Sequence, residues 1–312
     1  MGARVAFLGS PDFAVPSLCT LAAAGAVALV ITQPDRPAGR GRALHPTAVR
    51  RAAQELGLEV AVYERERRGE IETRLAALAL DALVVVAFGH ILRPSTLATA
   101  RLGAVNVHAS LLPRWRGVAP IERALLAGDA VTGITLMALD AGVDTGPVLQ
   151  QRIVPITPDD TRATLASRLA ERGAELLGDC LQAYLRGELA GVPQDGSAAT
   201  YAPRLDKESG RIDWRGDPVR IWNQVRALYG WPGAFTELGE VVLKVHAAQP
   251  LDLLPRAQPG TIVVADARRG VHVACGGGTL ELLELQLPGK PRLPAVELVR
   301  GRALGAGVRL GP

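Results

Sequence analysis

Residues 104–108 read Ala-Val-Asn-Val-His, a run that combines a strand-like pattern with polar side chains. In a strand, successive side chains point to opposite faces, so Asn106 and His108 share one face while Val105 and Val107 share the other. The valines indicate ordinary packing. The polar pair needs partners, because a buried polar group without a hydrogen bond costs free energy. An amide donor and an imidazole on one face could stabilise a developing oxyanion in acyl transfer.

A second polar cluster follows a later apolar run. Residues 138–147, ALDAGVDTGP, contain Asp140 and Asp144 in a glycine-rich turn. Ligands of open α/β sheets bind beyond the carboxyl ends of the strands, so we expect this turn to lie near the end of strand 104–108. A carboxylate there could orient His108 and move protons while an acyl group is transferred to an amine.

Each of these residues also has an ordinary structural interpretation. A single histidine at a strand end is more often a structural residue, and an aspartate in a glycine-rich turn is usually a turn former. The turn GSPDF at residues 9–13 lacks the GxGxxG pattern of a dinucleotide site. The remaining histidines show no metal-ligand spacing, so we expect no metal; they are His45, His90, His246 and His272. The residues alone indicate an α/β protein with a candidate acyl-transfer site.

The elements that would position these residues alternate along the first 150 residues. Apolar runs between helical patterns favour a doubly wound, mostly parallel sheet in a Rossmann-like α/β domain. Strands are predicted at residues 3–9, 26–32, 82–88 and 104–108, and helices at residues 17–25 and 46–57. Residues 134–140 and 147–156 predict a later antiparallel pair of strands. Thr161 is expected to cap a long helix that ends near Leu185.

The pattern changes after an aperiodic stretch at residues 187–205, rich in Gly, Pro, Ser and Ala. We expect a linker there, between a catalytic domain at residues 1–186 and a C-terminal domain at residues 206–312. A helix at residues 218–228 then precedes five short strands, which favour a small OB-like β-barrel. Those strands are predicted at residues 234–238, 241–249, 260–266, 271–275 and 279–286.

Composition is that of a globular protein with 312 residues, of which 48% are hydrophobic and 21% are charged. Cys19, Cys180 and Cys275 form no CxxC pair, which favours a reducing cytoplasm. We expect no membrane span and no signal peptide. The net charge of +4 arises entirely in residues 204–312, which hold 15 basic and 11 acidic residues. This excess indicates either a mildly basic surface or a domain that attracts a polyanion.

Longer motifs resemble the folate-dependent formyltransferases. VNVHASLLPRWRG at residues 105–117, followed by DAGVDTGPVL at residues 140–149, is similar to the signature of that family. The similarity extends into the C-terminal part through LDKESGRIDW, NQVRALYGWPGAF and LELLELQLPGKPRL. The resemblance implies transfer of a formyl group from 10-formyltetrahydrofolate to an amine. The C-terminal similarity implies the branch that formylates methionine on bacterial initiator tRNA in translation initiation.

The resemblance also implies roles for individual residues. Asn106, His108 and Asp144 match the catalytic trio of the family. Asn106 would bind the formyl oxygen, His108 would stabilise the tetrahedral intermediate, and Asp144 would hold His108 and assist proton transfer. The tetrahydrofolate-binding residues would be Ser110, Leu111, Leu112, Pro113, Phe88, Gly89, Ile91, Leu92 and Asp140.

Residues 33–46, QPDRPAGRGRALHP, carry three arginines among glycines and prolines. We expect no regular element here, and a long irregular segment in a compact domain is usually functional or disordered. The resemblance implies that Arg36, Arg40 and Arg42 approach the acceptor end of the tRNA, where arginines can contact phosphates and base edges. A solvated surface loop is the alternative.

Two other functions stay open. A sibling formyltransferase for a small amine, such as glycinamide ribonucleotide or an amino sugar-nucleotide, would share the trio without needing the arginine segment or the basic domain. A catalytically idle RNA-binding protein on the same scaffold is the second alternative, and the intact trio argues against it. We expect a monomer whose partners are methionyl-tRNA and the folate donor, with no membrane partner.

Overall fold

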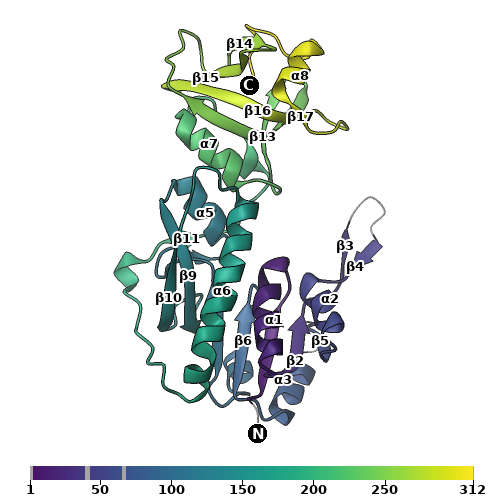
Figure 1. Cartoon of the computed structure of the whole chain (residues 1–312), viewed down its shortest axis with the longest axis vertical. Coiled ribbons are helices and arrows are strands. Elements are labelled where there is room, and N and C mark those ends of the chain that lie inside the picture. The colour runs from purple at the N-terminus through teal and green to yellow at the C-terminus, as the bar shows by residue number, and fades with distance from the viewer. Residues whose placement is uncertain (1–2, 39–42, 65–67, 312) are drawn as a thin grey trace. The chain divides into compact units, whose positions relative to one another are not determined.

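The computed structural model describes residues 3–38, 43–64 and 68–311, with the side chains of 36–38, 43 and 68 left out of the description. The chain divides into two compact units, which are described separately. Unit 1 consists of Met1–Pro120, Val131–Pro155 and Ala166–Pro203, and unit 2 consists of Ile121–Ala130, Ile156–Leu165 and Arg204–Pro312. Figure 1 shows their elements coloured along the chain.

A seven-stranded sheet forms the centre of unit 1, in the order β10-β9-β7-β6-β1-β2-β5. The pairs between β7 and β5 are parallel, whereas β9 pairs antiparallel with both β7 and β10. The mostly parallel sheet and the antiparallel pair are therefore confirmed. The strands are β1 (Val5–Gly9), β2 (Val27–Thr32), β5 (Val60–Val62), β6 (Ala82–Val86), β7 (Ala104–His108), β9 (Val131–Ala138) and β10 (Val148–Pro155).

Helices cover both faces of this sheet, which explains why its central strands are apolar throughout. Leu75 of α3 packs in one cluster with Leu83 of β6, on the face that Asn106 shares. On the opposite face α6 approaches β7 so closely that a Cβ at Gly173 would lie 2.8 Å from Val107 Cγ1. The helices are α1 (Val15–Ala23), α2 (Ala48–Glu55), α3 (Arg68–Ala77), α4 (Pro94–Leu97), α5 (Pro120–Ala127) and α6 (Arg162–Leu185).

The predicted helix starts follow from side-chain caps. Thr47 Oγ1 accepts a hydrogen bond from Arg50 N at 3.1 Å at the start of α2. Thr161 Oγ1 accepts from Thr164 N at 3.3 Å immediately before α6. These bonds satisfy backbone donors that a helix leaves unpaired in its first turn. The cap predicted at Thr161 and the end near Leu185 are both confirmed.

The expectation that residues 33–46 form no regular element is wrong. β3 (Arg36–Ala38) and β4 (Ala43–His45) pair antiparallel in a two-stranded ribbon. Pro37 lacks an N–H group, but each strand of a two-stranded ribbon is paired along one side only, so a proline is tolerated there. Composition alone misses such a hairpin, because its pairing is a backbone property.

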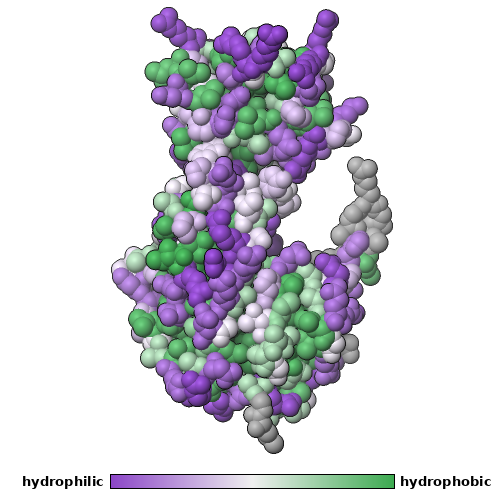
Figure 2. Space-filling model, viewed as in Figure 1, coloured by the Kyte–Doolittle hydropathy of each residue, from purple (hydrophilic) through white to green (hydrophobic). Residues whose placement is uncertain are grey.

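Unit 2 contains the five predicted strands in one antiparallel sheet, in the order β12-β13-β16-β15-β14, with β17 beside β16. Ile221 and Val225 of α7 pack with Leu243 and Leu280 in its core. Hydrophilic side chains project from its surface in Figure 2. The elements are α7 (Pro218–Ala227), β12 (Ala234–Leu238), β13 (Val241–Leu251), β14 (Ile262–Asp266), β15 (Gly270–Cys275), β16 (Gly278–Gln286), β17 (Leu293–Pro294) and α8 (Ala295–Arg300).

Within the described part of unit 2, no strand ladder joins β12 to β14, so the sheet is not a closed barrel. The chain end lies between these two edges instead. Gly311 N donates to Glu237 O at 2.9 Å, and Ile262 N donates to Val308 O at 2.8 Å. The predicted strands are confirmed, whereas their closure into an OB-like barrel is not.

A search of the described helices for a membrane span gives none that is long and apolar enough.

Candidate functional site

The sheet of unit 1 brings the predicted site segments to one edge. β1, β6 and β7 run parallel, with Gly9 beside Val86 and Val85 beside Asn106. The segments that leave the carboxyl ends of β6 and β7 therefore start at neighbouring positions. This edge is where open α/β sheets bind their ligands.

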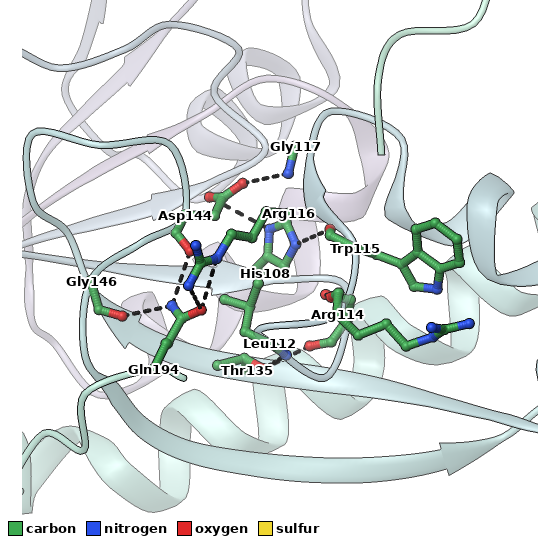
Figure 3. Close-up of polar contacts among 11 residues, drawn as sticks. His108, Leu112, Arg114, Trp115, Arg116, Gly117, Thr135, Asp144, Gly146 and Gln194 are labelled. Atoms are coloured by element: carbon green, nitrogen blue, oxygen red, sulfur yellow. Dashed lines mark hydrogen bonds and ion pairs between the residues drawn. The ribbon is translucent and has the colours of Figure 1, made fainter. Parts of the chain in front are cut away.

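His108 is the centre of the polar contacts in Figure 3. The residue is buried, with 6% of its surface exposed. Its Nε2 lies 3.1 Å from the carbonyl oxygen of Trp115, and its Nδ1 lies 3.7 Å from Asp144 Oδ1. Because a carbonyl oxygen only accepts hydrogen bonds, Nε2 carries the hydrogen. A second proton on Nδ1 would therefore face the Asp144 carboxylate.

Asp144 is fixed from two sides. Its Oδ2 accepts a hydrogen bond from the backbone N–H of Gly117 at 2.8 Å, which leaves Oδ1 facing His108. Its backbone adopts a φ of +53°, in the left-handed region, which Asp tolerates better than most residues with a Cβ. Neighbouring contacts help to hold the turn in this conformation.

Asn106 lies on the same face of β7 as His108, as predicted, and is half-buried. No hydrogen bond joins its side-chain amide to any residue in the described part of the chain. A half-buried amide at the edge of a ligand site retains its donors for a bound oxygen. The structure thus brings together the three predicted catalytic residues: His108 and Asp144 in direct contact, and Asn106 one pleat away.

The segment after β7 is held by buried hydroxyl groups. Ser110 Oγ donates to Arg114 O at 2.6 Å, and Ser110 is fully buried. Thr135 Oγ1 on β9 donates to Ser110 O at 2.6 Å and accepts from Leu112 N at 3.1 Å. Gln151 donates to Leu112 O at 2.8 Å and to Thr135 Oγ1 at 2.9 Å. Three side chains, those of Ser110, Thr135 and Gln151, therefore fix the predicted folate segment Ser110–Pro113, of which Leu111 and Pro113 are partly buried.

The other predicted folate residues follow β6. Phe88 and Leu92 are buried, whereas Ile91 is 73% exposed. Gly89 is exposed and has a φ of +80°. The carbonyl oxygen of Phe88 accepts a hydrogen bond from Gln33 Nε2 at 2.6 Å. The segment thus starts at the same sheet edge as His108, with two apolar side chains anchored in the core.

Asp140 braces the turn that carries Asp144. Its carboxylate accepts hydrogen bonds from Gly142 N at 3.0 Å and from Thr145 Oγ1 at 2.7 Å. The side chain is exposed, so its contacts in this structure are those of a turn former.

The structure describes the three predicted tRNA-binding arginines only in part. The backbone of Arg36 lies in β3, whereas Arg40 and Arg42 lie outside the described residues. The base of the ribbon is anchored by an ion pair between Asp35 and Arg50 of α2, at 2.9 Å.

Sequence reasoning missed Gln194, which contacts the turn that carries Asp144, and Arg116, which contacts Gln194. Arg116 is buried, and its guanidinium donates from two nitrogens to Gln194 Oε1, at 3.0 and 2.7 Å. The Gln194 amide donates to Asp144 O at 2.9 Å and to Gly146 O at 2.7 Å. Arg116 was visible in the RWRG motif but unassigned. Gln194 lies in the aperiodic stretch, where no pattern marks it.

A search for clusters of three or more His, Cys, Asp or Glu that could hold a metal ion finds none among the residues that the structure describes.

Family models match both parts of the chain. Residues 3–181 match the model described as formyl transferase, and residues 204–303 match the model described as formyl transferase, C-terminal domain.

Curated relatives match almost the full length. A methionyl-tRNA formyltransferase of Gluconacetobacter diazotrophicus is 49% identical over 311 residues, covering 99% of each chain. A methionyl-tRNA formyltransferase of Methylococcus capsulatus is 47% identical over 309 residues, with the same coverage.

Solved structures share the fold at lower identity. An N-formyltransferase from Helicobacter canadensis, in complex with folinic acid and dTDP-3-aminofucose, superposes with a TM-score of 0.67 at 18% identity, covering 90% of this chain and 98% of that chain. HypX from Aquifex aeolicus, in complex with tetrahydrofolic acid, superposes with a TM-score of 0.64 at 18% identity, covering 98% of this chain and 48% of that chain.

Proposed function

This chain belongs to the formyl transferase family, and we propose that it transfers the formyl group of 10-formyltetrahydrofolate to the methionine amino group of initiator methionyl-tRNA. The relatives that share nearly half of its residues over their full length carry the name of that activity. Formylation of this tRNA serves bacterial translation initiation.

The observation that supports the reaction is the arrangement around His108. A buried imidazole faces a carboxylate at 3.7 Å on one side and a backbone carbonyl at 3.1 Å on the other. An amide with free donors lies on the same strand face. Acyl transfer to an amine needs an oxyanion donor and a group that relays a proton, and these residue types supply both.

We assign the chemical steps to the trio as follows. The methionine amine attacks the formyl carbon, and the carbonyl oxygen gains negative charge. The Asn106 amide donates a hydrogen bond to this oxygen, and protonated His108 adds positive charge on the same face. Asp144 stabilises that imidazolium and accepts a proton from the attacking nitrogen, directly or through a water. The bond to N10 then breaks, and N10 of the released tetrahydrofolate takes up the proton.

The folate donor is assigned to the edge formed by the segments after β6 and β7. Its pterin ring needs an apolar wall and backbone hydrogen-bonding groups. Phe88 and Leu92 anchor the first segment, and the Thr135 network fixes Ser110–Pro113 in the second. No metal takes part in the steps assigned here.

The tRNA is assigned to residues 33–46 and to unit 2. The acceptor end would meet Arg36, Arg40 and Arg42 of that segment. Residues 204–312 hold 15 basic and 11 acidic residues, and a pocket of about 470 Å³ in unit 2 is lined by Lys207, Arg211 and Lys244 together with Glu208 and Glu237. Backbone phosphates are the part of a tRNA that such cations recognise.

The finer structural predictions remain part of this proposal. They are a catalytic domain at residues 1–186, a linker at residues 187–205, an OB-like barrel at residues 206–312, a monomeric state and a cytoplasmic location. The contacts of Gly311 with β12 and of Val308 with β14 support the barrel. The location follows from the substrate, because initiator tRNA is charged and used in the cytoplasm.

The direct test is formylation with purified protein. The wild type, supplied with 10-formyltetrahydrofolate and methionyl-tRNA, should yield formylmethionine after hydrolysis of the aminoacyl ester, and His108→Ala should yield almost none. A wild-type protein that binds the tRNA without formylating it would support the idle RNA-binding alternative instead.

A further inference from the structure

We propose that Gln194 is a positioning residue of the active site, which holds the Asp144 turn in its reactive conformation. The inference rests on the proposed role of Asp144. Gln194 lies between the ranges matched by the two family models, so it belongs to neither matched domain.

The turn that carries Asp144 includes a left-handed residue. Asp144 has a φ of +53°, a conformation that Asp tolerates better than most residues with a Cβ and that contacts with its surroundings stabilise. The Gln194 amide donates to the carbonyl oxygens of Asp144 and Gly146, at 2.9 and 2.7 Å. These two bonds bracket the turn from both ends. Together with the Gly117 N–H on Oδ2, they determine which oxygen faces His108.

The other end of the same side chain is held by Arg116. Two guanidinium nitrogens donate to Gln194 Oε1, at 3.0 and 2.7 Å, which fixes the amide plane and directs its N–H groups to the turn. Arg116 is 6% exposed, and no carboxylate of a described residue forms an ion pair with it. The buried guanidinium of Arg116 is paired with a neutral amide and not with a carboxylate of a described residue. Position 194 therefore needs a group that has both an acceptor for Arg116 and donors for the Asp144 turn.

The backbone that follows Gln194 is fixed at residues 200–202 (Figure 3 shows the side-chain contacts of Gln194). β11 (Tyr201–Ala202) pairs in parallel with β8 (Arg116–Gly117). Thr200 Oγ1 accepts from Trp115 N at 2.9 Å, and Thr200 O accepts from Arg116 N at 2.9 Å. Trp115 and Gly117 are the residues whose backbone contacts His108 and Asp144. The segment that leads out of unit 1 is therefore part of the scaffold of the trio.

The variant Gln194→Glu tests whether Gln194 orients Asp144 or only stabilises the fold. Glutamate keeps the oxygen acceptors for Arg116 and adds an ion pair, which offsets part of the stability lost with the two hydrogen bonds to the turn. It has no N–H donors, and it places a carboxylate oxygen against the carbonyls of Asp144 and Gly146. We expect kcat to fall about 10- to 100-fold, as for other small displacements of catalytic groups. KM for 10-formyltetrahydrofolate should stay within about two-fold, because ground-state binding is not removed.

The decisive measurement is a double-mutant cycle with Asp144→Asn, in single-turnover formylation of methionyl-tRNA. If Gln194 acts through Asp144, Gln194→Glu should cost little further activity in the Asp144→Asn background. Gln182→Ala, which removes an exposed glutamine side chain on α6, serves as the matched control and should behave as wild type. Gln194→Asn, which keeps an acceptor and donors but is one methylene shorter, enters the same cycle if Gln194→Glu does not fold.

Wild-type kcat in Gln194→Glu would overturn the inference, as would an equal loss of activity with and without the Asp144 carboxylate. Near-normal turnover of Asp144→Asn alone would instead refute the proposed site on which the inference rests.

Discussion

Asn106 and His108 share one strand face, yet their surroundings differ in a way that separates their roles. His108 is buried between a carbonyl oxygen and a carboxylate, which hold the ring in place. Asn106 is half-buried, and its side-chain amide forms no hydrogen bond with a described residue. A donor that stabilises charge only as the reaction proceeds contributes to kcat more than to ground-state binding. The two residues therefore predict different consequences of substitution.

Asn106→Ala should lower kcat about 10²- to 10³-fold, the usual cost of removing an oxyanion donor. Folding stability should change little, since the amide makes no hydrogen bond within the described protein. Steady-state kinetics with methionyl-tRNA and a thermal unfolding curve measure the two effects. A variant with normal kcat and raised KM would assign Asn106 to ground-state binding instead.

Thr135→Val should weaken both the fold and the folate site. Valine has the same shape, but it leaves Ser110 O and Leu112 N without the partner they now have. Loss of a buried partner costs about 1–3 kcal/mol of stability. We also expect a raised KM for 10-formyltetrahydrofolate, because this hydroxyl fixes the assigned folate segment. Thr73→Val on the exposed side of α3 is the control, and equal effects of the two changes would contradict this role.

At the scale of elements, the sequence predicts what depends on local pattern. Apolar runs gave the positions of β1, β2, β6 and β7, and a threonine gave the start of α6. Pairing between distant backbones has no such pattern. The β3–β4 ribbon and the β8–β11 pair were both missed for this reason. Their strands are only two or three residues long, and neither the composition nor the periodicity of such a short segment shows which segment it pairs with.

The same reasoning explains what was found and missed in the site. Asn106, His108 and Asp144 are visible because their types are unusual at strand ends and because their motif resembles a family. Gln194 and Thr135 act by hydrogen bonds to backbone atoms that only the folded chain brings near. Residues of this kind carry no local signal in one sequence.

The β3–β4 hairpin makes a separate prediction. Arg42→Ala should leave the free energy of unfolding within about 0.5 kcal/mol, as for most surface substitutions. If the arginine contacts a base edge of the acceptor stem, kcat/KM for methionyl-tRNA should fall by a factor that corresponds to about 1–3 kcal/mol of lost transition-state binding. Folate affinity should not change. Arg186→Ala, which removes an arginine paired with Glu188 elsewhere on unit 1, is the matched control. Equal losses in tRNA and folate use would reject the assignment of this hairpin to tRNA.

At the scale of the whole molecule, the trio and the excess of basic residues lie in different parts of the sequence. The trio lies within residues 1–203, where acidic and basic residues balance, while residues 204–312 carry four more basic than acidic residues (15 and 11). Such a division suits a substrate whose reactive end is small and whose remainder is a polyanion.

Neutralising a cation of unit 2 should therefore change the salt dependence of tRNA binding. Lys244 is exposed at the pocket of unit 2, and Lys244→Gln should reduce the slope of log Kd against log salt by about 0.7–0.9 if it contacts one phosphate. Folate binding should be unaffected. An unchanged slope, equal to that of Arg186→Gln, would exclude Lys244 from the tRNA interface.

The central claim is that methionyl-tRNA, and not a small amine, accepts the formyl group. The measurement is kcat/KM of the wild-type protein with 10-formyltetrahydrofolate and each acceptor in turn: methionyl-tRNA, glycinamide ribonucleotide and an amino sugar-nucleotide. A site that relies on remote binding to a polyanion should use the tRNA at least about 10³-fold better, because truncated acceptors lose the binding energy that supports catalysis. A higher kcat/KM for either small amine would contradict the account.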